Sequence, residues 1–374
     1  MKKYAIATML ILGGFVLGLA QPALAADPQY VISISVDGLG SSYLQNLLNL
    51  SQVPNFNRLK TEGVFTFNAR DDYNITETLQ NHVTMVTARG VYGGSDSPVD
   101  KNALTTTGHF WTVNGETGKT IHQNRANRYV ASVFDVAHDN GLKTGMYATK
   151  TKFNLLDYSY NATNGAPNVP YGKDKIDVAD VKDYNSAGIM SDYIPIMQST
   201  SPFNYSFVHF ADPDKAGHVS GWGSTNYNTA VKTVDGYLGQ IFSAIAGNSK
   251  LVGHTAVILT ADHGGTGTGH GDPSLALDYT IPFLVWGPGV TPGADLYALN
   301  SETRLDPLTL RPLYSAMPQP IRNADGANLA LDLLGLGSIP GSTVNYGQNL
   351  AVPEPATLAL VTLGGLLALR RRRQ

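Results

Sequence analysis

Short apolar runs rich in β-branched residues alternate along the chain with longer segments of mixed polar and apolar character. The runs have the length and composition of strands buried on both faces of a sheet, and they lie at residues 30–36, 65–69, 143–149, 205–210, 256–261 and 281–286. The segments between them predict helices at residues 41–50, 54–63, 74–87, 131–140 and 226–246. Alternating strands and helices favour an α/β fold, in which helices sandwich a largely parallel central sheet.

One segment departs from this alternation. Residues 154–201 are rich in Asn, Gly, Pro and Tyr, and they predict an irregular segment or a small cap. We place this cap within residues 90–201 of one catalytic domain that spans residues 26–349.

The first 25 residues read as a secretory signal peptide. Lys2 and Lys3 precede an apolar stretch, and Ala23-Leu24-Ala25 forms a small-x-small cleavage site. A retained membrane helix is the weaker alternative, because the cleavage site follows the apolar stretch directly. We therefore expect an exported protein. The lack of cysteine does not conflict with export, because an oxidising compartment permits disulfides without requiring them.

The last residues, 352–374, form a second segment outside the domain. Pro353-Glu354-Pro355 is followed by an apolar stretch at residues 356–369 and by four arginines at residues 370–373. This three-part pattern resembles the PEP-CTERM sorting signal of Gram-negative bacteria. The resemblance implies processing by an exosortase-type enzyme, transient membrane association, and a location in the periplasm, at the outer surface or in the extracellular matrix. A plain tail anchor is the alternative.

Charge limits the partners of the domain. The whole chain has a formal net charge of −3, and without the two end segments 20 basic and 28 acidic residues remain, which gives about −8. An acidic domain of this kind argues against a general nucleic-acid-binding surface.

Candidate metal ligands follow three of the predicted strands, just past their carboxyl ends. These residues are Asp37, Asp214, His218, Asp262, His263 and His270. In open α/β sheets, ligands bind at the edge formed by the carboxyl ends of the strands, so functional residues lie there. Three carboxylates and three imidazoles suit two zinc-like ions, with manganese and iron as alternatives, whereas magnesium prefers oxygen ligands alone. A polar turn with incidental histidines is the alternative for the stretch at residues 255–270.

These positions lie in motifs that resemble the alkaline phosphatase superfamily, and more closely its nucleotide pyrophosphatase/phosphodiesterase and phosphonoacetate hydrolase branches. The motifs are VDGLG at Asp37, TLQNH at Thr78, DPDKAGH around Asp214, TADHGG at Asp262, and HGDPSLALDYTIPFLVWGPG from His270. The resemblance covers residues 29–345 and implies an alkaline phosphatase-like fold.

The resemblance also implies residue roles. Asp214, His218 and His270 are expected to bind one zinc ion, and Asp37, Asp262 and His263 to bind the other. Thr78 is expected to be the nucleophile, to bridge toward the second zinc ion and to form a phospho-threonine intermediate. Asn114 stands where the family has an asparagine that hydrogen-bonds a phosphoryl oxygen.

Further positions bear on the substrate. Lys150 and Lys152 are similar to the lysines with which phosphonoacetate hydrolase holds a substrate carboxylate, and surface charge is their alternative. Leu79 and Gln80 follow Thr78 where the phosphodiesterase branch has Phe-Pro, so the aromatic ring expected to stack on a nucleobase is not supplied there. His209 and His82 flank the site motifs as candidate supporting hydrogen-bond donors.

The leading hypothesis is a two-metal phosphoryl hydrolase with phosphodiesterase or nucleotide pyrophosphatase activity on a small phosphate ester or nucleotide-like substrate. Two divalent ions, three carboxylates and one alkoxide sum to zero charge, which favours a monoanionic diester. The alternatives are a phosphomonoesterase, a phosphonoacetate hydrolase-like enzyme, or a non-catalytic metal-stabilised protein associated with exopolysaccharide. A sulfatase is disfavoured, because no Cys or Ser stands in a C/S-x-P-x-R motif.

Overall fold

The strands of the domain form one seven-stranded sheet in the computed structural model. The structure describes residues 28–91, 113–116, 118–122, 129–167, 171–345, 347 and 349–352. The strands are β1 (Tyr30–Val36), β2 (Val64–Arg70), β3 (Thr144–Ala148), β4 (Val178–Val181), β5 (Tyr205–Phe210), β6 (Thr255–Thr260) and β7 (Thr280–Trp286).

The strand order is β2-β7-β6-β1-β5-β3-β4, with β1 at the centre. β1 pairs in parallel with β5 and β6, and β3 pairs in parallel with β4 and β5. Only β7 runs against the others, because it pairs antiparallel with both β6 and β2. β5 and β6 are buried along their whole length, which explains their apolar composition. The largely parallel sheet predicted from the sequence is confirmed.

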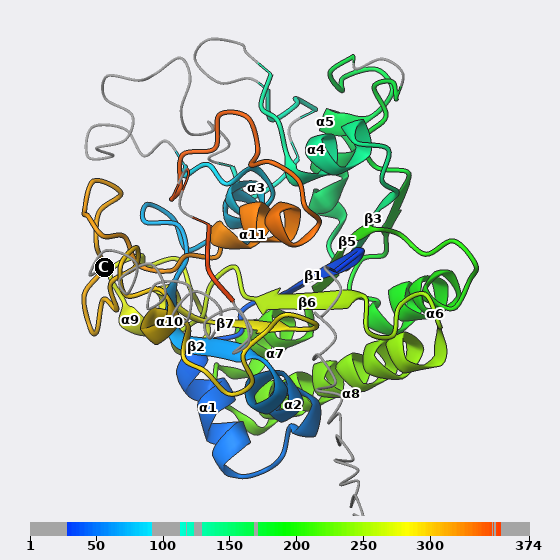
Figure 1. The fold of residues 1–374 in the computed structure, drawn as a ribbon. Coiled ribbons are helices and arrows are strands. Elements are labelled where there is room, and N and C mark those ends of the chain that lie inside the picture. Colours follow the sequence, from blue (N-terminus) through cyan, green and yellow to red (C-terminus); the bar gives the residue numbers. More distant parts are fainter. Residues whose placement is uncertain are drawn as a thin grey trace, which may run out of the picture.

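Helices cover both faces of the sheet (Figure 1). The helices are α1 (Ser41–Asn49), α2 (Pro54–Glu62), α3 (Thr78–Thr87), α4 (Val133–Asp139), α5 (Asn154–Tyr160), α6 (Ser186–Met197), α7 (Asp212–Ser220), α8 (Thr225–Gly247), α9 (Ala276–Tyr279), α10 (Leu296–Leu299) and α11 (Asp325–Leu333), with a 3₁₀ turn at Thr151–Phe153. On one face, the long α8 packs against α1, α2, α6 and α7. On the other face, α11 packs against α3, α4, β1 and β6.

Two expectations about elements differ from the structure. The helix expected at residues 74–87 begins only at Thr78, because Thr76 pairs with His270 through both its carbonyl and its hydroxyl, and this pairing holds the preceding turn out of the helix. Residues 154–201, expected to be irregular, contain α5, the edge strand β4 and α6.

Several expectations concern residues outside the described ranges. The signal peptide at residues 1–25 lies outside them, as do all residues of the C-terminal segment after Val352. The cap expected within residues 90–201 lies partly outside, since residues 92–112 and 123–128 are not described. Within the described ranges, none of the helices combines the length and the hydropathy that crossing a bilayer requires.

Candidate metal centre and nucleophile

Adjacent parallel strands bring the six candidate ligands to one edge of the sheet. Asp37 follows β1, Asp262 and His263 follow β6, and Asp214 lies in the first turn of α7, which follows β5. Because β6, β1 and β5 are neighbours and run in the same direction, their carboxyl ends meet. The N-terminal turn of α7 is anchored there, since Asp214 donates its backbone N–H to the Asp37 carbonyl at 3.1 Å.

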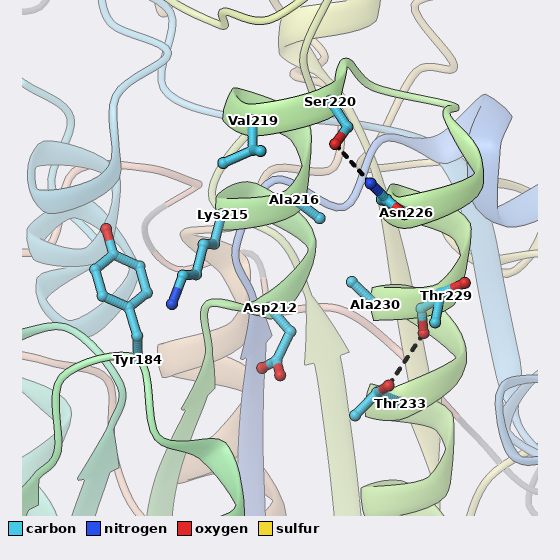
Figure 2. Close-up of a pocket in the computed structure, with 10 residues that line it drawn as sticks. All are labelled: Tyr184, Asp212, Lys215, Ala216, Val219, Ser220, Asn226, Thr229, Ala230 and Thr233. Atoms are coloured by element: carbon cyan, nitrogen blue, oxygen red, sulfur yellow. Dashed lines mark hydrogen bonds between the residues drawn. The ribbon is translucent and has the colours of Figure 1, made fainter.

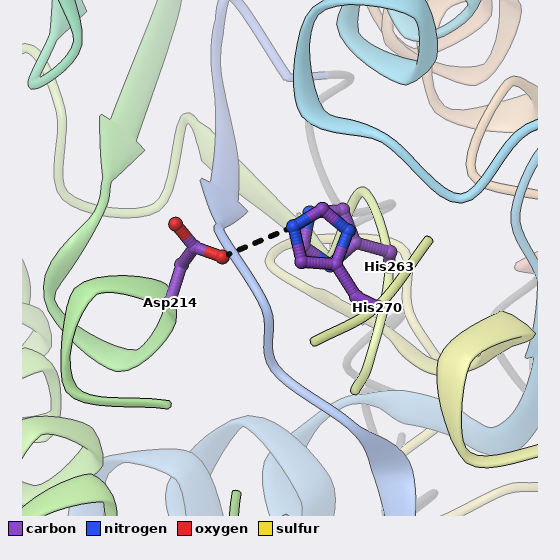
Figure 3. A group of neighbouring side chains, drawn as sticks. All are labelled: Asp214, His263 and His270. Carbon is purple, nitrogen blue, oxygen red and sulfur yellow. Dashed lines mark ion pairs between the residues drawn. The ribbon is translucent and has the colours of Figure 1, made fainter. Parts of the chain in front are cut away.

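The ligand atoms form two buried groups. One contains Asp214, His263 and His270, and the other contains Asp37, Asp262 and His263; within each group the atoms lie within 4.8 Å of one another. His263 therefore lies within reach of both groups, whereas the resemblance placed it in only one. Figure 3 shows the Asp214 carboxylate pointing toward the imidazoles of His263 and His270, whose rings are stacked at 3.6 Å. His218 joins the first group, with its Nε2 3.3 Å from Asp214 Oδ1 and 3.2 Å from His270 Nε2.

Backbone carbonyls set the tautomer of all three imidazoles. His263 Nδ1 lies 2.8 Å from the Gly264 carbonyl, His270 Nδ1 lies 2.6 Å from the Thr76 carbonyl, and His218 Nδ1 lies 3.0 Å from the Thr268 carbonyl. A carbonyl only accepts hydrogen bonds, so each Nδ1 must carry the proton. In the neutral ring Nε2 then carries a free lone pair, and this is the form of imidazole that binds a metal ion.

Four buried atoms of these residues have no hydrogen-bond partner. They are Asp37 Oδ1, Asp214 Oδ1, Asp262 Oδ2 and His263 Nε2. Burying a lone pair without a partner is costly, and carboxylates are rarely buried without a counter-charge. The free atoms belong to the two groups described above, so the donor set fits a pair of divalent cations that favour mixed nitrogen and oxygen ligands.

Lys150 lies between the two groups and is not a surface residue. It follows β3 and is only 4% exposed. Its Nζ lies 2.7 Å from Asp37 Oδ2 and 2.6 Å from Asp214 Oδ2, and it donates a hydrogen bond of 3.2 Å to Thr78 Oγ1. Burial alone would lower the pKa of Lys150, but the carboxylates of Asp37 and Asp214 outweigh burial and raise it.

The protein groups alone shift the pKa values of two of the carboxyl groups in opposite directions and lower the pKa of one imidazole. Burial raises the pKa of Asp262 well above its ordinary value, and the nearby charge of Asp37 acts in the same direction. Burial also acts to raise the pKa of Asp37, but Lys150 and His209 together hold it well below the ordinary value. Burial, with the neighbouring His270, lowers the pKa of His263 to about 3, which keeps this imidazole neutral.

Thr78 is the first residue of α3, and its side chain is buried beside Lys150. The next residue, Leu79, donates its backbone N–H to Asn114 Oδ1 at 3.1 Å, and Lys152 Nζ donates to the same oxygen at 2.8 Å. The structure thus brings together every residue that the sequence singled out for nucleophile or substrate. Burial lowers the pKa of Lys152, and the charge of Lys150 lowers it further.

A second layer of buried polar residues orients the ligands. His209 Nε2 lies 3.0 Å from Asp37 Oδ2, and His82 Nδ1 lies 2.6 Å from the Thr78 carbonyl. His82 Nε2 is 2.8 Å from Ser35 Oγ, which ties the first turn of α3 to β1. Sequence reasoning named both histidines but missed Ser35, although a serine inside an apolar strand is a usable signal. It also missed Asn323, whose Nδ2 bonds Asn81 Oδ1 at 3.0 Å, because no local motif marks this residue.

The indole of Trp222 packs against glycines of three site motifs. Its Nε1 donates to the Gly38 carbonyl at 2.8 Å. A Cβ atom at Gly265 would lie 2.2 Å from the indole, one at Gly217 would lie 2.7 Å away, and one at Gly38 would lie 3.2 Å away. These glycines let the indole lie directly against the backbone beneath the metal ligands.

A surface pocket of about 410 Å³ lies on the outer side of α7 and is not part of this site. Figure 2 shows that it is formed by α7, α8 and the segment that carries Tyr184. Lys215 points toward the Tyr184 ring at 4.5 Å. Asp214 and His218 do not line this pocket, so α7 presents one face to the candidate metal centre and another to solvent.

Comparisons with known proteins identify a family and a sorting motif. Residues 31–283 match the family described as type I phosphodiesterase / nucleotide pyrophosphatase, and residues 351–374 match the PEP-CTERM protein-sorting motif. Ectonucleotide pyrophosphatase/phosphodiesterase family member 3 of Mus musculus is 27% identical over 236 residues, which is 63% of this chain. The chain spans about a quarter of the length of that relative, since the match covers 24% of it.

Solved structures show the same fold at low identity. Murine ectonucleotide pyrophosphatase/phosphodiesterase 5 in complex with AMP superposes with a TM-score of 0.54 at 14% identity, covering 83% of this chain and 96% of that one. A protein in the alkaline phosphatase superfamily from Vibrio parahaemolyticus gives a TM-score of 0.51 at 15% identity, covering 85% of this chain and 69% of that one.

Proposed function

Because the chain belongs to the type I phosphodiesterase / nucleotide pyrophosphatase family, we propose that it is an exported phosphoryl hydrolase with two divalent metal ions and Thr78 as its nucleophile. One observation carries this proposal: a single ammonium group, that of Lys150, contacts Asp37, Asp214 and the Thr78 hydroxyl. The nucleophile therefore lies beside both groups of free ligand atoms.

The residues divide between two sites. Asp214, His218 and His270 would hold one ion, and Asp37, Asp262 and His263, with the Thr78 oxygen, would hold the other. Zinc suits this mixture of imidazole and carboxylate best. When bound, the ions supply Lewis-acid stabilisation of negative charge on the attacking and leaving oxygens.

The chain's own residues prepare Thr78 for attack. The ammonium group of Lys150 stabilises negative charge on Thr78 Oγ1, and the N-terminus of α3 adds its positive dipole end. Attack forms a bond from Thr78 Oγ1 to phosphorus and breaks the bond from phosphorus to the leaving oxygen, while the threonine hydroxyl loses its proton to solvent and the leaving oxygen takes up a proton from solvent. Water then hydrolyses the phospho-threonine, which releases phosphate or a monoester and restores the threonine hydroxyl.

Asn114 is suited to hold the phosphoryl group during this reaction. Its Oδ1 already accepts from Leu79 N and Lys152 Nζ, so its amide NH₂ group is left to donate to a phosphoryl oxygen. Lys152 adds a positive charge on the same side of Thr78.

We expect Thr78→Ala to abolish hydrolysis of p-nitrophenyl phosphate esters while both metal ions stay bound, because the six side-chain ligands remain. The measurement combines turnover with metal analysis of the same sample. Chelation of the wild type should abolish turnover as well. A non-catalytic, metal-stabilised protein would show no turnover with or without the chelator. Wild-type-like turnover by a fully metallated Thr78→Ala variant would remove Thr78 from the mechanism.

The position of Lys150 supports a second candidate, a hydrolase of dianionic substrates. The zero charge balance that favours a diester holds only without Lys150; with its ammonium included, the site has one net positive charge. A phosphomonoester or a carboxylate-bearing phosphonate, with two or more negative charges, would gain more from that positive charge than a diester with one.

Substrate preference decides between the two candidates. For a diesterase, bis-p-nitrophenyl phosphate should have the higher kcat/KM; for the second candidate, p-nitrophenyl phosphate or phosphonoacetate should. If the dianionic substrate is preferred, Lys152→Met should reduce kcat/KM for that substrate by roughly ten- to hundredfold, since a hydrogen bond to a charged group contributes about 1.5–3 kcal/mol. Lys232→Met, at an exposed position on α8, is the matched control. Equal, small effects of both substitutions on all substrates would exclude Lys152 from substrate binding.

Export and sorting complete the proposal. The PEP-CTERM motif supports export in a Gram-negative bacterium and processing by an exosortase-type enzyme. The signal peptide at residues 1–25 is consistent with this route, which ends in the periplasm, at the outer surface or in the extracellular matrix.

A further inference from the structure

The segment between α10 and α11 exposes an unusual number of aliphatic side chains. Their exposed fractions are 60% for Leu305, 71% for Leu308, 67% for Leu310, 40% for Leu313 and 72% for Met317. We call these five residues the leucine rim. Single exposed leucines are ordinary on protein surfaces, but a concentration of them in one short segment marks an interaction site. Leu308 also borders a hollow of about 510 Å³, which Phe65, Phe67 and Leu277 line together with polar residues.

The leucine rim lies close to the point where the chain leaves the domain. Ala351 is held there by Asn300, which accepts from the Ala351 N–H at 2.7 Å and donates to its carbonyl at 3.0 Å. Asn300 ends α10, and Tyr297 of the same helix donates to the Asn68 carbonyl at 3.0 Å. Asn68 in turn donates its amide to the Leu308 carbonyl at 3.0 Å. A series of hydrogen bonds through α10 and Asn68 thus connects the exit of the tail to the backbone of Leu308.

Only a short linker follows this exit before the sequence becomes apolar. Three residues, Pro353-Glu354-Pro355, separate Val352 from the apolar stretch. At roughly 3.1 Å per residue for a proline-rich linker they reach about 9 Å. The fourteen apolar residues at positions 356–369 would span roughly 21 Å as a helix, less than the roughly 30 Å of a bilayer core. A tail that is too short for the bilayer draws the attached domain toward the lipid.

We propose that the leucine rim is a lipid-contacting surface, which rests on the outer face of the cytoplasmic membrane while the C-terminal tail is inserted. The short tether brings the surface around Ala351 within about a nanometre of the bilayer. The side chains of the rim also fit lipid better than a protein partner, because they are unbranched or γ-branched aliphatics, and leucine is under-represented at protein–protein hot spots, where Trp, Tyr and Arg dominate. This inference concerns a surface outside the candidate metal centre and stands without the proposed reaction.

The absence of cysteine from the chain makes a site-specific test direct. Leu308→Cys and Leu310→Cys would each be labelled with an environment-sensitive fluorophore in the chain with its tail, bound to vesicles of phosphatidylethanolamine and phosphatidylglycerol. Val252→Cys, in the turn before β6 and 50% exposed, is the matched control. We expect lipids that carry a quencher in their acyl chains to remove most of the emission at residues 308 and 310 and little of it at residue 252.

Three outcomes would overturn the proposal. The first is equal quenching at all three positions in chains that float with the vesicles. The second is a failure of the chain to bind the vesicles. The third is a fluorescence change that follows protein concentration without lipid, which would assign the rim to contact with a second copy. As a further measurement, Leu308→Asn with Leu310→Asn should weaken vesicle binding several-fold and leave hydrolysis of a soluble p-nitrophenyl ester unchanged.

Discussion

Each imidazole of the candidate metal centre is oriented by a backbone carbonyl: two of these carbonyls lie in the glycine-rich turn after β6, and the third lies far away in the sequence. His270 is held by Thr76, just before α3, whereas His218 is held by Thr268 in the glycine-rich turn. His263 is held by its own neighbour, Gly264. The orientation of His270 therefore depends on the segment that leads into the nucleophile helix. A change at His270 disturbs both the metal ligand and the approach to Thr78.

We expect His218→Ala and His270→Ala each to lose one metal ion per chain and most of the activity. His218 is 46% exposed and His270 is 8% exposed at the side chain, so His270→Ala should also cost more folding stability. Metal analysis and thermal unfolding of both variants measure the two effects. Retention of two ions in either variant would remove that histidine from the ligand set.

Local motifs selected residues that lie together in the structure, because the motifs with Asp37, Asp214 and Asp262 each follow one of three neighbouring strands whose ends lie at the same edge of the sheet. They were not enough to show what Lys150 does. Two lysines after a strand are usually surface charges, and only the position of β3 beside β5 places Lys150 among buried carboxylates. Burial of this kind depends on the order of strands in the sheet, which a local pattern does not contain.

At the scale of elements, the strands were predicted closely and the less regular helices were not. β1 and β5 are continuous apolar runs, so their bounds could be read directly. β4 is a short, partly exposed edge strand without such a run. α11 is buried from Asp325 to Leu331, polar residues included, so it has no exposed polar face to give a helical periodicity. Asn328 lies inside it and accepts from the Ile339 N–H at 2.9 Å.

α2 shows how one element supports another. Its N-terminal N–H groups, on Asn55 and Phe56, donate to Asp235 of α8 at 2.9 and 2.8 Å. Asp235 thus caps the N-terminus of α2, although it belongs to a helix that is distant in sequence. We expect Asp235→Ala to lower the free energy of unfolding by about 1–3 kcal/mol and to leave kcat unchanged. Chemical denaturation measures this loss, and Asp235→Asn, which keeps one acceptor oxygen, should lose less. Wild-type stability of Asp235→Ala would show that solvent caps α2 equally well.

At the scale of the whole molecule, the candidate metal centre lies where three strands and helices from both faces of the sheet come together. Its ligands come from segments after β1, β5 and β6, and Thr78 comes from a helix on one face of the sheet while Asp214 comes from a helix on the other. Lone pairs are buried without a partner at this junction. The free energy of metal binding would therefore add to the free energy of folding.

We expect a chelator to lower the melting temperature of the wild type and added zinc to restore it. Free zinc at about a hundred times its dissociation constant would contribute about 2.7 kcal/mol per site. The shift measured for His270→Ala should be smaller, because that variant has already lost one ion. Identical melting curves of the wild type with chelator and with zinc would show that metal binding does not contribute to folding stability.

The nest of glycines around Trp222 limits how the site motifs can vary. Gly38, Gly217 and Gly265 belong to three motifs far apart in sequence, yet each faces the same indole. A Cβ atom at Gly265 would lie 2.2 Å from the indole and one at Gly217 would lie 2.7 Å away, whereas one at Gly38 would lie 3.0 Å from Asp214 and 3.2 Å from the indole, so a substitution at any of the three requires its neighbours to shift. The effect of a substitution at any of the three glycines therefore depends on the residue at position 222. In a mutational library a non-glycine residue at Gly265 should survive only together with a smaller residue at position 222, and the ancestry of the three motifs should be read as the history of one packing unit.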